Sequence, residues 1–186
     1  MKILFFANTE WYLYNFRRSL LLAARDAGYD VLLVSPPGPY VEKLQALGLR
    51  WIAAPLERRS LNPIKELSAI NWLRKLIIAE QIDLVHGFTI KCAVYGAIAA
   101  RLAGNRARVS AITGLGYVFI SNDLKARLLR PVVRNIFRYA LHGEKTRLIV
   151  ENSDDLAFFQ KTGLIEPSRI RLIRSSGVDC SRFSQC

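Results

Sequence analysis

The chain has 186 residues, of which 51% are hydrophobic and 23% are charged, a composition that excludes disordered, collagen-like and coiled-coil proteins. Its 27 Lys and Arg residues outnumber 15 Asp and Glu residues, giving a net charge of +12, so we expect an anionic partner such as nucleic acid, a membrane surface or a phosphorylated substrate. Three cysteines without paired spacing indicate neither a zinc site nor a disulfide framework, and no apolar run reaches the roughly 18 residues of a membrane span.

Short β-rich runs alternate with longer helical patterns, which is typical of βαβ units and a parallel sheet. The predicted strands are 2–7, 30–35, 51–54, 83–86, 108–113, 147–150 and 170–173. The predicted helices are 13–27, 41–47, 63–80, 93–102, 124–141 and 153–161. Because this length fits one core, we predict a single domain over residues 1–186: an α/β, Rossmann-like, doubly wound parallel sheet of about seven strands with helices on both faces.

Individual residues mark where these helices should begin, end or bend. Gly28 and Gly48 follow helices at positions that favour a left-handed C-cap. Pro63 suits a first helical turn, and Ser153 is predicted to cap the last helix. Pro131 lies inside a helical pattern and is expected to kink or restart that helix.

The loops that follow the strands are the candidate site, because ligands of open parallel sheets bind beyond the carboxyl ends of the strands. The first loop contains Asn8 and Glu10 but no glycine, which argues against a dinucleotide-binding enzyme. We therefore predict no cofactor, and nothing in the sequence requires a metal. Gly114 and Gly116, after the fifth strand, either let a substrate approach the backbone or serve a turn that needs positive φ.

Two further residues near these loops have a functional and a structural interpretation. His86 ends a buried strand and is either a general base or sugar-hydroxyl ligand, or a structural histidine. Lys91, at the entry to a helix, either neutralises a phosphate or is a solvated surface lysine. The sequence alone leaves both pairs of alternatives open.

The segment 125–141 carries arginines at helical spacing, with apolar residues between them and no acidic residue. These are Arg127, Arg130, Arg134 and Arg138. Such a helix either lies on an anionic membrane surface or packs conventionally with a solvated arginine face. Nucleic-acid binding is not predicted, because the chain lacks zinc-finger spacing, an RNA-recognition motif and a recognition helix. The first alternative predicts a cytoplasmic protein, peripheral on the inner face of the membrane.

Six segments spread along the chain form a recognisable set: 2–7, 15–18, 83–91, 113–119, 151–155 and 173–179. The most specific are Gly-Leu-Gly-Tyr-Val-Phe from Gly114 and Ser-Gly-Val-Asp from Ser176. Together they resemble the N-terminal domain of family-four retaining GT-B glycosyltransferases, especially the subgroup that adds sugars to polyprenyl-diphosphate-linked intermediates of surface polysaccharides.

The resemblance implies that the complete enzyme transfers a hexose or N-acetylhexosamine from a nucleotide-sugar to a lipid-linked acceptor. This domain would hold the acceptor, and a donor-binding C-terminal domain, absent from this chain, would hold the nucleotide-sugar; the fragment alone is expected to be inactive. The same resemblance implies roles for the loop residues: Lys91 approaches the acceptor diphosphate, Thr113, Gly114 and Gly116 line the cleft, and Asn152 and Asp155 border the substrate. A free-standing membrane-docking or partner-binding module and half of a two-domain nucleotide-sugar epimerase remain as alternatives.

Overall fold

The computed structural model describes residues 1–57, 60, 62–104, 106–114, 119, 121 and 123–177. In these residues, seven strands form one sheet in the order β3-β2-β1-β4-β5-β6-β7, and every neighbouring pair is parallel. The strands are β1 Lys2–Phe6, β2 Asp30–Ser35, β3 Arg50–Ala53, β4 Leu84–Phe88, β5 Ala107–Ile112, β6 Thr146–Val150 and β7 Ile170–Leu172. The predicted parallel, Rossmann-like sheet is confirmed.

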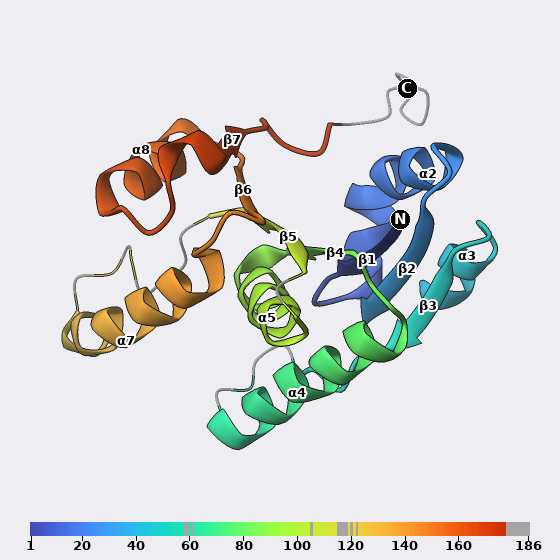
Figure 1. Ribbon diagram of the computed structural model, residues 1–186, viewed down its shortest axis with the longest axis horizontal. Helices are drawn as coiled ribbons and strands as arrows, with labels where there is room; N and C mark the ends of the chain where they lie inside the picture. The colour runs from blue at the N-terminus through green and yellow to red at the C-terminus, as the bar shows by residue number, and fades with distance from the viewer. Residues whose placement is uncertain are drawn as a thin grey trace, which may run out of the picture.

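Helices cover both faces of this sheet, as a doubly wound fold requires (Figure 1). The helical segments are α1 Glu10–Tyr12, the π-helical turn η1 Leu13–Arg17, α2 Arg18–Asp26, α3 Val41–Gln45, α4 Pro63–Ala79, α5 Thr89–Leu102, α7 Leu124–Leu141, α8 Ser153–Thr162 and the 3-10 turn η2 Pro167–Arg169. Helices α2 and α3 lie on one face, and α4, α5 and α7 lie on the other (Figure 1).

Strand β1 shows why these sequences form a two-sided core. Its Leu4 and Phe6 belong to the cluster that contains Leu73 and Ile77 of α4. Phe5 points to the opposite face, into the cluster with Leu21 of α2. Because successive side chains of a strand alternate between faces, a continuous apolar run is what a strand covered on both sides needs.

The junction between β4 and α5 differs from the prediction. The strand continues two residues past the predicted end at His86, and α5 begins at Thr89 rather than at residue 93. Gly87 pairs with Phe6 of β1 inside the sheet. A Cβ at Gly87 would lie 2.5 Å from the Cys92 carbonyl oxygen and 2.7 Å from Ala93 Cα. This glycine therefore does not end the strand; it lets α5 pack closely against it.

Helix ends confirm some of the local predictions and correct others. Gly28 and Gly48 adopt positive φ after their helices, and Pro63 lies in the first turn of α4 as predicted. The predicted cap of α8 is wrong: the N-cap is Asn152, not Ser153, and its side chain accepts a hydrogen bond from the Asp155 amide. The helix predicted over 13–27 is divided into η1 and α2, and the helical region already begins at Glu10 with α1. Helix α7 continues through Pro131 without restarting.

Candidate functional site

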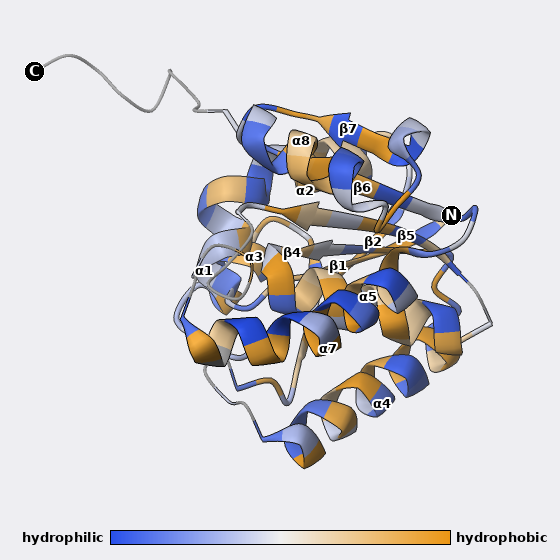
Figure 2. Cartoon of the chain, turned by 90° about the vertical axis from the view of Figure 1, so that its left-hand side faces the viewer, coloured by the Kyte–Doolittle hydropathy of each residue, from blue (hydrophilic) through white to orange (hydrophobic). Residues whose placement is uncertain are grey.

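The predicted loop residues lie along one edge of the sheet, which we call the rim. Because all strands are parallel, their carboxyl ends meet at this edge, and β1, β4, β5 and β6 are consecutive neighbours within it. Asn8 and Glu10 follow β1, Lys91 follows β4, Thr113 and Gly114 follow β5, and Asn152 and Asp155 follow β6. In Figure 2 the rim faces the side of α1, opposite the N-terminus. Gly116 lies outside the described residues.

Lys91 is already bound by three groups of the protein. Its Nζ donates to the carbonyl oxygens of Glu57 at 2.7 Å and Ser60 at 3.1 Å, and to Glu66 Oε1 at 2.9 Å. Burial tends to raise the pKa of Glu66, but hydrogen bonds from Lys91, Tyr95 and Ser60 outweigh it and hold the pKa below its usual value. The ammonium group therefore clamps the segment before α4 onto α5.

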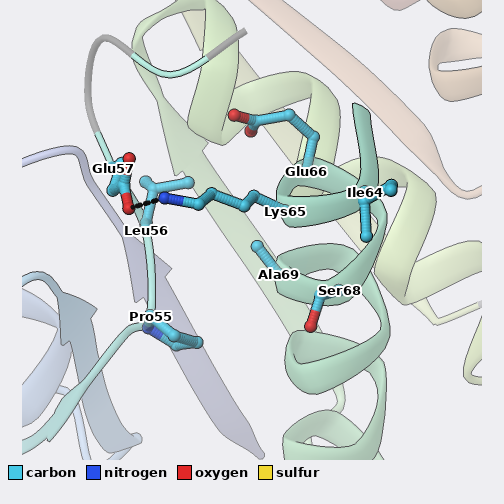
Figure 3. A pocket seen from close by; sticks show the side chains of 8 residues that line it. All are labelled: Pro55, Leu56, Glu57, Ile64, Lys65, Glu66, Ser68 and Ala69. Carbon is cyan, nitrogen blue, oxygen red and sulfur yellow. Dashed lines mark hydrogen bonds and ion pairs between the residues drawn. The ribbon is translucent and has the colours of Figure 1, made fainter. Parts of the chain in front are cut away.

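A hollow of about 370 Å³ lies beside this clamp, between the segment after β3 and the first turns of α4. Pro55, Leu56 and Glu57 line one side, and residues of α4 line the other (Figure 3). Lys65 reaches across the opening to Glu57, with 2.6 Å between Nζ and Oε1. Both lysines near the hollow are thus paired with carboxylates.

Glu10 presents the opposite situation. It is the first residue of α1 and is only 5% exposed. A Cβ on Gly38, in the loop after β2, would lie 2.1 Å from Glu10 Oε1, so the carboxylate rests directly against this glycine. Within the described part of the chain, its carboxylate takes part in no hydrogen bond or ion pair. The rings of Tyr14 and Tyr40 stand 5.3 Å apart at the same junction of loops.

His86 lies in the core rather than on the rim. Its ring lies 4.3 Å from that of Phe88 and 5.6 Å from that of Phe5, centre to centre. Burial, with a smaller contribution from the charge of Arg17, lowers the pKa of His86 to about 3. The imidazole is therefore neutral at physiological pH, and its Nε2 is buried without a hydrogen-bond partner in the described structure.

Arg17 connects three of the rim loops, although the loop-by-loop interpretation of the sequence did not single it out. Its guanidinium donates to Glu151 Oε1 at 2.9 Å and to the hydroxyl of Tyr12. It also lies 4.9 Å from the centre of the Phe88 ring. Burial raises the pKa of Tyr12 despite this neighbouring cation. The only signal in the sequence was the Asn-Phe-Arg-Arg segment from Asn15. It contributed to the family resemblance, but it assigned no function to Arg17.

The remaining rim residues are placed as follows. Thr113 is exposed. Gly114 has φ +117, so the turn that needs positive φ is present, and no atom of a described residue lies within 4 Å of the position of a Cβ. Asn152 and Asp155 bond to each other at the start of α8, with Nδ2 3.0 Å from Oδ2. The Asn152 side chain thus caps the helix, and the Asp155 carboxylate holds that cap in place.

Helix α7 exposes apolar and cationic side chains next to each other, visible as adjoining orange and blue segments (Figure 2). Leu124, Leu128, Val132 and Ile136 are exposed and recur every four residues, so they form one stripe along the helix. Phe137, Ala140 and Leu141 face the core. Arg130 donates to the Ser121 carbonyl and Arg134 to the Thr162 carbonyl, whereas no side-chain bond to a described residue holds Arg127 or Arg138.

None of the described helices is both long and apolar enough to traverse a bilayer.

Comparison with protein families identifies this architecture. The family model for glycosyl transferase 4-like proteins matches residues 2–153, which include six of the seven strands. The chain belongs to the glycosyl transferase 4-like family. Among its relatives, the N,N'-diacetylbacillosaminyl-diphospho-undecaprenol alpha-1,3-N-acetylgalactosaminyltransferase of Campylobacter jejuni is 28% identical over 98% of this chain and 48% of its own length. The UDP-Gal:alpha-D-GlcNAc-diphosphoundecaprenol alpha-1,3-galactosyltransferase of Escherichia coli is 28% identical over 84% of this chain and 39% of its own.

Solved structures share the fold of this glycosyl transferase 4-like chain. A glycosyltransferase from Rickettsia africae superposes with a TM-score of 0.68 at 17% identity, over 97% of this chain and 44% of that one. The UDP-GlcNAc 2-epimerase of Methanocaldococcus jannaschii superposes with a TM-score of 0.63 at 13% identity, over 93% of this chain and 45% of that one. The chain thus spans between 39% and 48% of the length of these relatives and structures.

Proposed function

We propose that this chain is the acceptor-binding half of a glycosyltransferase. The complete enzyme would transfer a hexose or N-acetylhexosamine from a nucleotide-sugar to a lipid-linked acceptor in surface polysaccharide biosynthesis. The observation that carries this proposal is the alignment of nearly the whole chain with about half of an enzyme whose name specifies an undecaprenyl-diphosphate-linked acceptor. A second domain, facing the rim, would hold the nucleotide-sugar.

In this proposal, the residues of the rim position the acceptor for the reaction. Asn8, Glu10, Thr113 and Gly114 would contact the acceptor, because they follow neighbouring strands at the same edge of the sheet. The family resemblance assigns the same role to Gly116. Holding two reactants in a productive orientation is a major part of enzymatic rate enhancement. The charge that develops on the leaving diphosphate would be stabilised by the donor-binding domain.

Asn152, Asp155 and Lys91 take a different part, because protein groups already bind them. Asn152 caps α8, and Asp155 accepts a hydrogen bond from it; both would shape the border of the acceptor site. Lys91 would reach an acceptor diphosphate only after leaving Glu66. His86, neutral and enclosed by aromatic rings, would support β4 rather than exchange a proton with the substrate.

Helix α7 would place the domain on the inner, anionic face of the membrane, where a lipid-linked acceptor is available. Its apolar stripe and the neighbouring arginines Arg127, Arg130, Arg134 and Arg138 have the composition of an interfacial helix. Basic residues near such a surface contribute about 1 kcal/mol each. The net charge of +12 favours the same partner.

A binding experiment tests the assignment of the acceptor to this domain. The tryptophan fluorescence of the chain, to which the exposed rim residue Trp11 contributes, is titrated with a short-chain polyprenyl-diphosphate-linked N-acetylhexosamine and, separately, with UDP-N-acetylhexosamine. We expect saturable binding of the lipid-linked sugar, at least tenfold weaker binding of the nucleotide-sugar, and no turnover when both are present. A short-chain polyprenol controls for adsorption of lipid.

Two results would contradict the proposal. Preferential binding of the nucleotide-sugar would indicate a donor domain or half of an epimerase, since an epimerase acts on the nucleotide-sugar without a lipid. Turnover by the purified chain would show that a second domain is not required.

A further inference from the structure

The unpaired carboxylate of Glu10 is the feature of the rim that the protein leaves incomplete. A carboxylate removed from water is destabilising unless hydrogen bonds or an opposite charge compensate it. Other buried or half-buried charges at the rim have such partners: Lys91 has Glu66 and two carbonyls, and Arg17 has Glu151 and Tyr12. Glu10, 5% exposed, has none among the described residues, so its oxygens remain open to water or to a ligand that brings hydrogen-bond donors.

The surroundings of Glu10 indicate what kind of partner fits. Tyr14 lies one turn after Glu10, and Tyr40 lies two residues after Gly38, which contacts the carboxylate. The two tyrosine rings are 5.3 Å apart, centre to centre. The carboxylate therefore lies where the β1 and β2 loops meet. The two rings belong to the same pair of segments, and Lys43 Nζ lies 4.5 Å from the centre of the Tyr40 ring and 5.8 Å from that of Tyr14.

A sugar ring matches this combination of groups. Hydroxyl and amide N–H groups donate strong hydrogen bonds to a carboxylate, and the apolar C–H face of a sugar can pack on an aromatic ring. A metal ion does not match, because it needs several hard ligands and no group of three acidic, His or Cys side chains is found among the described residues.

We propose that Glu10, Tyr14 and Tyr40 form a subsite for a sugar ring of the acceptor, in which Glu10 accepts hydrogen bonds from a hydroxyl or amide group. Glu10 is then a specificity-determining residue: it distinguishes a lipid diphosphate that carries the correct sugar from one that carries none. This inference rests on the proposed acceptor-binding function. It adds the interactions by which the rim would recognise the sugar of the acceptor.

A substitution at Gly38 can displace the same carboxylate sterically, independently of any change at Glu10. Its backbone φ is not in the left-handed region, so alanine fits the backbone. The new Cβ would nevertheless lie 2.1 Å from Glu10 Oε1 and must push the carboxylate away. Gly38→Ala therefore moves Glu10 without changing any charge, whereas Glu10→Gln removes the charge and keeps the shape.

The test compares two probes: short-chain polyprenyl-diphosphate-linked N-acetylglucosamine and the same polyprenyl diphosphate without a sugar. The wild-type chain should bind the sugar-bearing probe at least tenfold more tightly. Glu10→Gln and Gly38→Ala should each lose most of this preference and bind the sugar-free probe as the wild type does. Glu42→Gln is the matched control, because Glu42 is an exposed carboxylate on the neighbouring α3, and it should retain the full preference.

The outcomes separate this inference from the proposed function. If the wild type binds both probes equally, the sugar subsite is refuted while acceptor binding by the domain is supported. If it binds neither, the proposed function fails and the subsite fails with it. If Glu10→Gln keeps the preference, the role of Glu10 is refuted whatever the domain binds.

Stability measurements exclude a merely structural role. Because Glu10 has no described partner to lose, Glu10→Gln should leave the melting temperature unchanged or raise it. The double variant with Gly38→Ala should bind the sugar-bearing probe no more weakly than Glu10→Gln alone, since both changes remove one interaction. A marked fall in melting temperature with loss of both probes, or additive losses in the double variant, would overturn the proposal.

Discussion

Lys91 and Glu10 are opposite charges on loops of the same rim, and the fold treats them differently. The ammonium of Lys91 is held by a carboxylate and two backbone carbonyls. The carboxylate of Glu10 is more deeply buried yet unpaired among the described residues. The first charge is part of the scaffold that holds the segment before α4 in place, whereas the second is available to a ligand that brings hydrogen-bond donors.

This contrast shows that position on the rim does not by itself assign a role. Both residues follow parallel strands at the edge where ligands of such sheets bind. Removing a charge that the protein has paired should destabilise the fold, while removing an unpaired one should affect binding alone. The following changes test that distinction, beginning with the largest effect.

Gly87→Ala should disturb the support of Lys91 most severely. The added Cβ would lie within 2.7 Å of Cys92 and Ala93 backbone atoms, so α5, which carries Lys91, must move away from β4. We expect the free energy of unfolding to fall by about 3 kcal/mol, measured by urea denaturation. Gly96→Ala is the control on the same helix, because its nearest new contact is a methyl group of Val85 at 3.1 Å and alanine favours helix. Equal losses in the two variants would contradict the backbone approach described here.

Lys91→Met should destabilise the protein by about 2 kcal/mol, because it leaves the Glu66 carboxylate without its cation at a site where the two side chains are only 19% and 12% exposed. Lys65→Met removes a similar ion pair whose side chains are 57% and 61% exposed, and should change stability by less than about 0.5 kcal/mol. Urea denaturation of both variants beside Glu10→Gln measures the contrast directly. If Glu10→Gln loses as much stability as Lys91→Met, the distinction between the two charges fails.

His86 should make the stability of the protein depend on pH. Its pKa is about 3 in the folded state and about 6.5 in an unfolded chain, so between these values the unfolded state binds more protons. Its contribution is therefore fully present above pH 6.5 and decreases as the pH falls, by up to about 1.4 kcal/mol per pH unit. His86→Phe should remove this slope between pH 6 and 4 in urea titrations. His142→Gln, at an exposed position, should keep it.

The sequence was sufficient for the fold because its signals are local. Continuous apolar runs such as residues 2–6 identify strands buried on both faces, and Gly28 or Pro63 mark helix ends through their own backbone preferences. The cap of α8 was missed by one residue through a local choice between Asn152 and Ser153, whereas the end of β4 was missed because a tertiary contact overrides a local preference. Gly87 resembles the end of a strand, yet it is a strand residue that allows a helix to approach.

The site was less predictable, because pairing between distant residues decides it. Nothing near Lys91 in the sequence indicates that Glu66 and the carbonyls of Glu57 and Ser60 will enclose it. Likewise, the partners of Arg17 include Glu151, 134 residues away. Parallel topology predicts which loops share an edge, but only coordinates show which charges on that edge are already neutralised.

Helix α7 also carries both paired and unpaired charges, but on the outer surface. Replacing an arginine there should have the smallest effect of the changes considered. Arg127 and Arg138 form no side-chain bond to described residues, so both can meet an anionic membrane. Replacing the two with glutamine should weaken binding to anionic vesicles by about fivefold for each charge removed, since each contributes about 1 kcal/mol at such a surface. Co-sedimentation with vesicles of phosphatidylglycerol and phosphatidylcholine measures this loss of binding.

Replacing Arg147 and Arg171 with glutamine is the control, because it lowers the net charge equally; their guanidinium groups bind nearby carbonyls. If both pairs reduce binding alike, attraction comes from the total charge of +12, and α7 has no special role; a larger loss for the α7 pair locates the contact on that helix.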